Sequence, residues 1–134
     1  MNKIMIFGTF DILHKGHLNK FKQAKKYGEL IVVIARDDTV KKVKGKKPKH
    51  SEKQRQKAVK KYGKSLLGYK TDKYKIIEKY KPDIIGLGYD QNSFTKDLKK
   101  ELKKRKLKIK IIRFKPYKQH KYKSSLLQNR NFYK

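Results

Sequence analysis

The chain alternates short apolar runs with lysine-rich segments in which apolar residues recur at helical spacing. The apolar runs, several of them rich in β-branched residues, predict strands over residues 4–7, 30–35, 65–67, 83–87 and 108–114. The segments between them predict helices over residues 15–27, 52–62, 73–80 and 93–105, with a last helix beginning at Ser124. Ser51 and Gln54 have the spacing of a capping box at the start of the second helix. We expect residues 37–50, which are rich in lysine and contain glycine and proline, to form a loop.

This alternation of strands and helices predicts a single α/β domain over residues 1–134. The expected architecture is an open, mainly parallel five-stranded sheet with helices on both faces. In such sheets, ligands bind beyond the carboxyl ends of the strands, where the strand order reverses. The segments that follow the strands are therefore the candidate ligand-binding segments: residues 8–17, 36–47, 88–92 and 116–125.

The charge of the chain is strongly positive, with 40 Lys+Arg against 11 Asp+Glu and a formal net charge of +29. A field of this sign attracts nucleic acid, anionic membranes and phosphorylated metabolites. The cations are mostly lysines spread along the whole chain, and lysine is a generic point charge, whereas arginine reads bases and phosphates with a planar fork. We therefore interpret the excess mainly as a solvated surface, with weak nonspecific nucleic-acid binding as a side property.

Other features of the composition limit the possible chemistry and location. There is no cysteine, which excludes disulfides, thiolate zinc sites and cysteine nucleophiles and suits a reducing compartment. The N-terminus lacks the pattern of a signal peptide, and no apolar stretch approaches the length of a membrane span. We expect a cytoplasmic protein that does not use a membrane.

The segment after the first predicted strand, GTFDILHKGH, carries the chemistry. A glycine at its start permits a tight exit from the strand, so that the N–H groups of Thr9 and Phe10 can approach a phosphate. His14 and His17 lie three residues apart and face one side of the first helical turn, where Gly16 leaves room for a ligand. Two imidazoles beside a positive helix N-terminus suit a phosphoryl centre that gains negative charge.

Less specific interpretations of this segment exist. Two histidines at this spacing can bind a metal ion, although no third histidine, cysteine or well-spaced carboxylate accompanies them, or they can be surface residues. From a different class, the chain could be a basic nucleic-acid-binding module on the same fold, because tyrosines alternate with lysines in PYKQHKYK and RNFYK. Such a module gives no reason for the spacing of the two histidines.

The string GTFDILHKGH resembles the G-T-F-D-x-x-H-x-G-H signature of the cytidylyltransferase-like nucleotidyltransferases, and the resemblance extends over nearly the whole chain. It implies a Rossmann-like sheet and an Mg²⁺-dependent, in-line attack of an acceptor phosphate on the α-phosphate of a nucleoside triphosphate. Pyrophosphate leaves, and no covalent enzyme intermediate forms. The resemblance also implies that nucleotide phosphates hold most of the Mg²⁺ coordination, and that a homodimer is a possible assembly.

The resemblance assigns roles to particular positions of this sequence. His14 and His17 would be catalytic and stabilise the transition state. Nucleotide contacts would come from Gly8, Thr9, Phe10, Lys15, Gly16, Asp90, Tyr117, Ser124 and Ser125. Phosphate or acceptor contacts would come from Asp11, Lys44, Lys46 and Arg55. Structural alternatives remain open, namely loop organisation by Asp11, a solvated helix charge at Arg55, a turn aspartate at Asp90, helix capping by Ser124 or Ser125, and tail packing by Tyr117.

Three further stretches resemble the archaeal type of FAD synthase within this family: ARDDTVKKVKGKKP, KPDIIGLGYDQNSF and YKQHKYKSSLL. This resemblance implies ATP as the donor and FMN as the acceptor. The alternative is a CTP-dependent enzyme that acts on glycerol 3-phosphate or a similar alcohol phosphate. Such enzymes tend to carry an acidic pair followed by tryptophan after the fourth strand, where this chain has Gly88-Tyr89-Asp90-Gln91 and no tryptophan anywhere.

Overall fold

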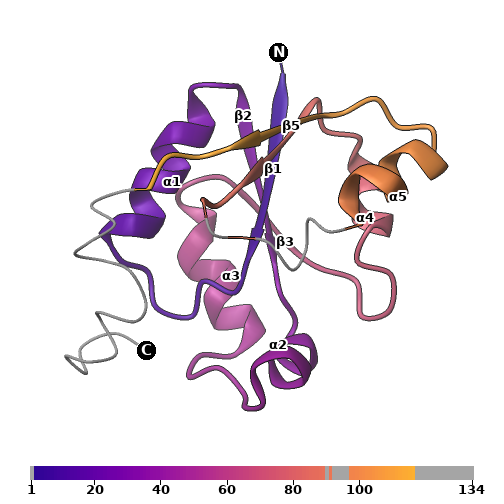
Figure 1. The fold of residues 1–134 in the computed structure, drawn as a ribbon. Coiled ribbons are helices and arrows are strands. Elements are labelled where there is room, and N and C mark those ends of the chain that lie inside the picture. The colour runs from indigo at the N-terminus through magenta and orange to yellow at the C-terminus, as the bar shows by residue number, and fades with distance from the viewer. Residues whose placement is uncertain (1, 90, 92–96, 117–134) are drawn as a thin grey trace.

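Five parallel strands form one sheet at the centre of the computed structural model (Figure 1). The structure describes residues 2–89, 91 and 97–116. The strands are β1 (Lys3–Gly8), β2 (Glu29–Ile34), β3 (Lys64–Leu67), β4 (Ile84–Leu87) and β5 (Lys110–Arg113). They lie in the order β3-β2-β1-β4-β5, and every neighbouring pair is parallel. The predicted open α/β sheet is confirmed.

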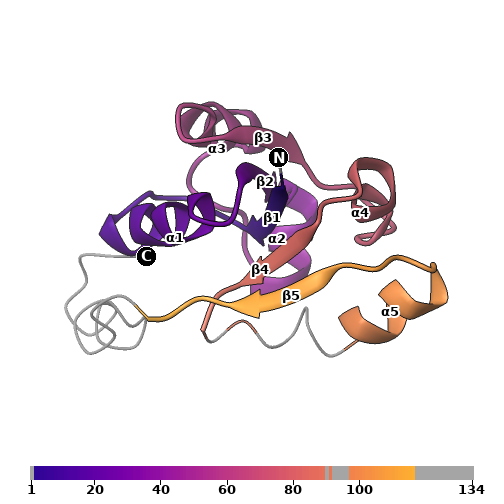
Figure 2. The same cartoon turned by 90° about the horizontal axis from the view of Figure 1, so that it is seen from above.

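Helices cover both faces of this sheet, as Figures 1 and 2 show. They are α1 (Lys15–Lys25), α2 (Asp37–Lys44), α3 (Glu52–Lys60), α4 (Lys75–Tyr80) and α5 (Leu98–Lys104). Successive side chains of a strand point to opposite faces, so Ile4 and Ile6 pack with residues of α1 and α3, whereas Met5 and Phe7 pack with residues of α4 and α5. Among the described helices, none is both long enough and apolar enough to span a bilayer.

The expectation that residues 37–50 form a loop is wrong in its first half, because α2 occupies Asp37–Lys44. The first turn of α2 is acidic and its last turn is rich in lysine, which favours the helix through its macrodipole. Val40 anchors the helix with 4 % of its surface exposed, and Gly45 ends it in the left-handed conformation with φ 81°. The only apolar residues of α2 are Val40 and Val43, which stand at the i, i+3 spacing of a helix face, and a single pair in a lysine-rich segment next to glycine and proline is a weak helix signal.

Other element boundaries agree with the sequence or differ by a few residues. The capping box is present: Gln54 N–H donates to Ser51 Oγ at 3.2 Å, and Ser51 N–H donates to Gln54 Oε1 at 2.9 Å. Helix α4 begins at Lys75, two residues later than predicted. Residues 93–96, predicted to begin the next helix, and the helix predicted from Ser124 lie outside the described residues.

The strand order fixes where the ligand-binding segments meet. From β1, the chain first adds β2 and β3 on one side and then β4 and β5 on the other, so the order reverses at β1. All five strands run in one direction, and their carboxyl ends therefore share one edge of the sheet. The loop after β1 leaves at this edge beside the crevice between β1 and β4, which is the favoured ligand position in such sheets.

Candidate active site

The loop after β1 turns back over its own strand. Phe10 adopts a left-handed conformation with φ 53°, which carries a strain of order 1–3 kcal/mol for a residue other than glycine. Its ring is buried and lies against Gly8, where an added Cβ would come within 2.8 Å of two ring carbons. The same ring contacts His17 edge-on, with 5.3 Å between ring centroids. Gly8 therefore makes room for a ring that supports one of the two motif histidines.

His14 is the N-cap of α1, and its imidazole satisfies a donor that the first turn leaves unpaired. Its Nδ1 accepts a hydrogen bond from Gly16 N–H at 3.0 Å, and its ring lies so close to Gly16 that a Cβ there would sit 2.7 Å from Cε1. An Nδ1 that accepts a hydrogen bond has no proton, so neutral His14 carries its proton on Nε2. Gly16 thus fixes both the position and the tautomer of His14.

His17 stacks on His14, with 3.9 Å between the ring centroids and 32° between the ring planes. Burial lowers the pKa of His17 to about 3, and the nearby charges of His14 and Lys20 act in the same direction. Burial also lowers the pKa of His14. His17 Nδ1 is buried without a hydrogen-bond partner among the described residues. A backbone hydrogen bond with Ile12 acts in the opposite direction, but a pKa of about 3 keeps His17 uncharged near neutral pH, so the stacked pair avoids the repulsion between two adjacent cations.

Positive potential surrounds this histidine pair. The charge of Lys44, the last residue of α2, contributes to the lowered pKa of His17, which locates its ammonium near the pair. The N-terminus of α1 adds the positive end of a helix dipole at the same place. Lys46 follows in the exposed segment after α2, and Lys15 is exposed at the start of α1. Imidazole N–H donors in a positive field suit a phosphate better than a cation.

A buried arginine bonds to four different segments beneath the site. The side chain of Arg55 on α3 has no exposed surface, and its guanidinium donates to the carbonyl oxygens of Thr9 and Ala35 at 2.8 Å each. It also donates to the His50 carbonyl at 3.0 Å and to Asp37 Oδ1 at 2.7 Å. The N–H groups of Arg55 bond to the protein's own carbonyls and to a carboxylate. In this structure Arg55 is therefore neither a solvated helix charge nor a phosphate ligand. Arg55 fixes the backbone of the motif loop against the ends of β2 and α3.

Asp11 makes a second link between the motif loop and the segment before α3. Its Oδ2 accepts from Lys49 N–H and its Oδ1 from His50 N–H, each at 2.8 Å. The His50 imidazole also lies 3.5 Å from Oδ1. The loop-organising alternative therefore describes the contacts of Asp11 in this structure.

Two residues that the sequence did not single out shape the crevice between β1 and β4. The Gln91 amide donates to the Phe7 carbonyl at 3.4 Å and accepts from Gly88 N–H at 3.1 Å. Arg113 at the end of β5 donates to the carbonyl oxygens of Gly88 and Gln91 at 2.7 and 3.0 Å. Arg113 could have been suspected as one of only five arginines in a lysine-rich chain, whereas Gln91 lies in the predicted ligand-binding segment 88–92 but no pattern gave it a role of its own.

The structure thus brings several predicted site residues together. Those of the motif, from Gly8 to His17, lie at the carboxyl end of β1, with Lys44 near the histidines. Four of the predicted contacts lie outside the described residues: Asp90, Tyr117, Ser124 and Ser125. Among the described residues, no group of three or more histidines, cysteines or carboxylates could hold a metal ion.

The buried position of Arg55 predicts a large loss of stability when its charge is removed. We expect Arg55→Met to lower the free energy of unfolding by about 3–5 kcal/mol, because it leaves three carbonyls and Asp37 without their donor. Arg55→Lys should lose less, since it keeps the charge but not the fork. Urea denaturation measures both, with the exposed Lys57→Met on the same helix as a control. A loss below about 1 kcal/mol in Arg55→Met would contradict this structural role.

The lowered pKa of His17 predicts a specific pH dependence of stability. Between pH 6.5 and about 3, the unfolded chain binds a proton at this position and the folded chain does not, so stability falls as the pH decreases through this window. His17→Asn removes the titration and should flatten this fall by up to about 1.4 kcal/mol per pH unit. Urea denaturation followed by circular dichroism from pH 7 to pH 4 gives both slopes. Parallel slopes would show that His17 titrates normally.

Comparisons with known proteins agree with the resemblance of the motif. The family model described as cytidylyltransferase-like matches residues 5–130. An FAD synthase of Aciduliprofundum boonei is 42% identical over 120 residues, which cover 87% of this chain and 80% of the relative. An FAD synthase of Methanothermus fervidus is 46% identical over 121 residues, covering 85% of this chain and 83% of the relative.

A solved structure shares the fold as well. The crystal structure named as a lipopolysaccharide core biosynthesis protein from Thermoplasma volcanium superposes with a TM-score of 0.81 at 40% identity, over 87% of this chain and 98% of that chain. The match of the family model over nearly the whole chain, together with these relatives, shows that the protein belongs to the cytidylyltransferase-like family.

Proposed function

We propose that this protein is an FAD synthase, an FMN adenylyltransferase that transfers AMP from ATP to FMN and releases pyrophosphate. The observation that carries the proposal is the extent of its likeness to proteins named FAD synthase: four archaeal relatives are 42–46% identical over 84–93% of this chain. The aligned regions cover 76–83% of those relatives, so the likeness concerns nearly the whole enzyme.

The reaction joins the phosphate of FMN to the α-phosphate of ATP and separates that α-phosphate from the β-phosphate. A phosphate oxygen of FMN attacks the α-phosphorus of ATP, and the bond from that phosphorus to the oxygen bridging the α- and β-phosphates breaks. Negative charge increases on the oxygens around the α-phosphorus and on the leaving pyrophosphate. In this proposal, His14 and His17 donate N–H bonds to these oxygens, and Lys44 with the α1 N-terminus supplies positive potential; the stacked pair at the start of α1 supports these roles.

A neutral His17 suits a site that takes up a proton when an anionic nucleotide binds. Without a nucleotide, burial and the neighbouring positive groups keep its pKa low. A triphosphate beside the ring would raise that pKa, because an anion within a few ångströms favours the protonated form. The histidine pair can therefore bind a proton together with the nucleotide and stabilise the charge that develops during transfer.

A divalent cation is expected to act with the nucleotide rather than in a protein cage. Asp11 is the carboxylate of the motif loop, and both of its oxygens already accept backbone N–H bonds. The residues present therefore provide one partly committed carboxylate, which fits an Mg²⁺ ion carried mainly by triphosphate oxygens. Such an ion would neutralise phosphate charge.

Three further expectations from the sequence stay predictions: a cytoplasmic location, a homodimer and weak nucleic-acid binding.

Donor and acceptor can be tested with the purified protein, Mg²⁺ and defined substrates. We expect ATP with FMN to yield FAD and pyrophosphate, measured by chromatography of the flavins and a pyrophosphate-coupled assay. CTP with glycerol 3-phosphate, run in parallel, should yield no product. Turnover with CTP and an alcohol phosphate but not with ATP and FMN would replace this proposal with the cytidylyltransferase alternative. RNA binding without turnover of either triphosphate would favour the nucleic-acid module.

The motif histidines predict a loss of activity that exceeds any loss of stability. His14→Ala and His17→Ala should each lower kcat by about two orders of magnitude or more, since each removes a donor to the transition state. Thermal unfolding should shift far less than the activity does. Lys22→Ala, an exposed change in the last turn of α1, is the matched control and should keep full activity. Full activity in either histidine variant would remove the mechanism described above.

A further inference from the structure

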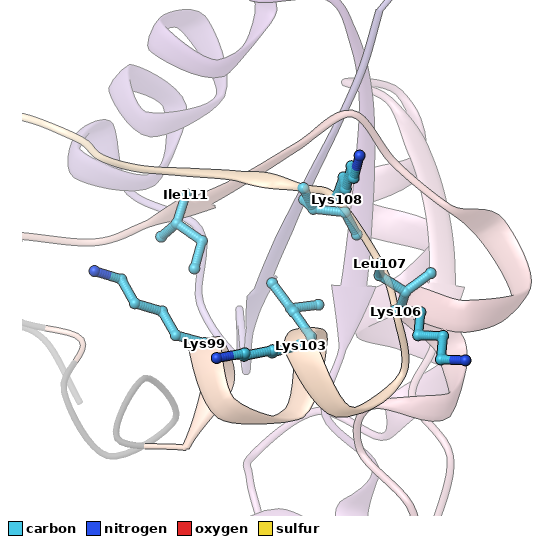
Figure 3. A pocket seen from close by; sticks show the side chains of 8 residues that line it. Lys99, Lys103, Lys106, Leu107, Lys108 and Ile111 are labelled. Atoms are coloured by element: carbon cyan, nitrogen blue, oxygen red, sulfur yellow. The ribbon is translucent and has the colours of Figure 1, made fainter.

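A groove of about 540 Å³ lies between α5 and β5, away from the motif loop (Figure 3). We name it the α5–β5 groove. Its lining combines four lysines with four aliphatic side chains and contains no acidic or aromatic residue: Lys99, Leu102, Lys103, Lys106, Leu107, Lys108, Ile109 and Ile111. The proposed reaction uses none of these residues.

The two walls of the groove present regular patterns. The α5 wall uses Lys99, Leu102 and Lys103, the i, i+3 and i+4 spacing of one helix face, and Lys106 follows in the turn after the helix. The opposite wall uses the alternate residues Leu107, Ile109 and Ile111, which share one face of the strand and the segment before it. All three of these side chains are half-buried at the edge of the core shared with α4 and α5. The result is an aliphatic floor bordered by ammonium groups.

The groove follows the last strand of the sheet order. Strand β5 pairs with β4 alone among the described strands, and Figure 2 shows it at the outer edge of the sheet. The N–H groups of Lys110 and Phe114 donate inward, to Asp83 at 3.1 Å and to Leu87 at 2.8 Å. Because peptide groups alternate in direction along a strand, those of Ile109 and Ile111 point toward the outer edge. The same two residues therefore offer backbone groups to a further strand and aliphatic side chains to the groove.

The charge and shape of the α5–β5 groove indicate which kind of ligand it can bind. A second copy of this chain would bring another strongly basic surface against the lysines, and the chain's own residues 117–134 contain five Lys+Arg and no acidic residue. A groove is concave, whereas a bilayer surface is broad and flat. Nucleic acid favours aromatic stacking platforms and arginines, and the lining has neither. An extended segment with acidic and aliphatic side chains can pair its carboxylates with the lysines, pack its aliphatic groups on the floor and bond its backbone to the strand edge.

We propose that the α5–β5 groove binds an acidic, aliphatic peptide segment of a partner protein, which adds to β5 as a further strand. Backbone hydrogen bonds along Ile109 and Ile111 hold the segment in register. Its aliphatic side chains cover the floor, and its carboxylates reach the lysines at the rim. The partner is thus recognised through β-strand addition and opposite charge, outside the nucleotide site.

The probe for this proposal is a labelled peptide with a valine-rich centre and glutamates at both ends, measured by fluorescence anisotropy at constant salt. A second peptide replaces each valine with serine and keeps the charge. We expect the valine peptide to bind at least about tenfold more tightly than the serine peptide. In an amide NMR spectrum, Ile109 and Ile111 should show the largest shifts.

Two charge-matched variants separate the groove from the general positive field. Lys99→Glu with Lys103→Glu changes the α5 rim, and Lys53→Glu with Lys57→Glu makes the same change at the same spacing on exposed positions of α3. We expect the first pair to weaken binding about tenfold or more and the second by no more than about threefold. Equal effects of both pairs, equal binding of the serine peptide, or no binding of the valine peptide would each overturn the proposal. The same NMR experiment is repeated with anionic vesicles and with oligouridine. If either shifts the amide signals of the groove more than the valine peptide does, the proposal is overturned in favour of a membrane or RNA.

Discussion

The conformation of the motif loop depends on one buried guanidinium. Arg55 bonds to carbonyl oxygens at the end of β1, the end of β2 and the segment before α3, and to a carboxylate in the first turn of α2. A buried cation is tolerable only where such partners surround it. Because these partners belong to four different segments, the charge requires them to meet. Thr9 is held by this contact directly beside Phe10, whose strained backbone directs its ring to His17.

The histidine pair shows why this rigidity matters for phosphate chemistry. Two imidazoles at 3.9 Å cannot both become cations at low energetic cost, and burial disfavours even one charge. A flexible loop would relax by separating the rings or exposing them to water. The Gly16 hydrogen bond to His14 and the Phe10 contact with His17 prevent that relaxation. In the proposed reaction, this rigid pair receives an anion, and the nucleotide itself supplies the negative charge that favours protonation.

The sequence was most informative where a pattern reflects local physics. β-branched runs located the strands, and the Ser51–Gln54 capping box located α3, because these signals act within a few residues. It was least informative where the deciding contact is distant in the chain. Arg55 looks like any helix charge until Thr9 and Ala35, 46 and 20 residues away, are brought to it. Gln91 reaches Phe7 across 84 residues, which no local spacing could indicate.

The arginines and lysines of this chain have separate functions in the structure, and this explains how a net charge of +29 coexists with a selective site. Four of the five arginines lie among the described residues, and each makes several fixed bonds to carbonyls or carboxylates: Arg36, Arg55, Arg105 and Arg113. Their planar forks suit such rigid positions.

The lysines of the described residues, in contrast, are exposed apart from the half-buried Lys20, and several lie over tyrosine rings, as Lys64 and Lys79 do over Tyr80. Most of the positive charge of the chain is therefore carried by hydrated ammonium groups. Such a field raises the local concentration of every anion, ATP and FMN included, without distinguishing among them. Discrimination must then come from the fixed geometry around β1 and β4, where arginines and buried backbone groups set the shape. The abundant charge governs how often anions arrive, and the few buried contacts govern which of them fit.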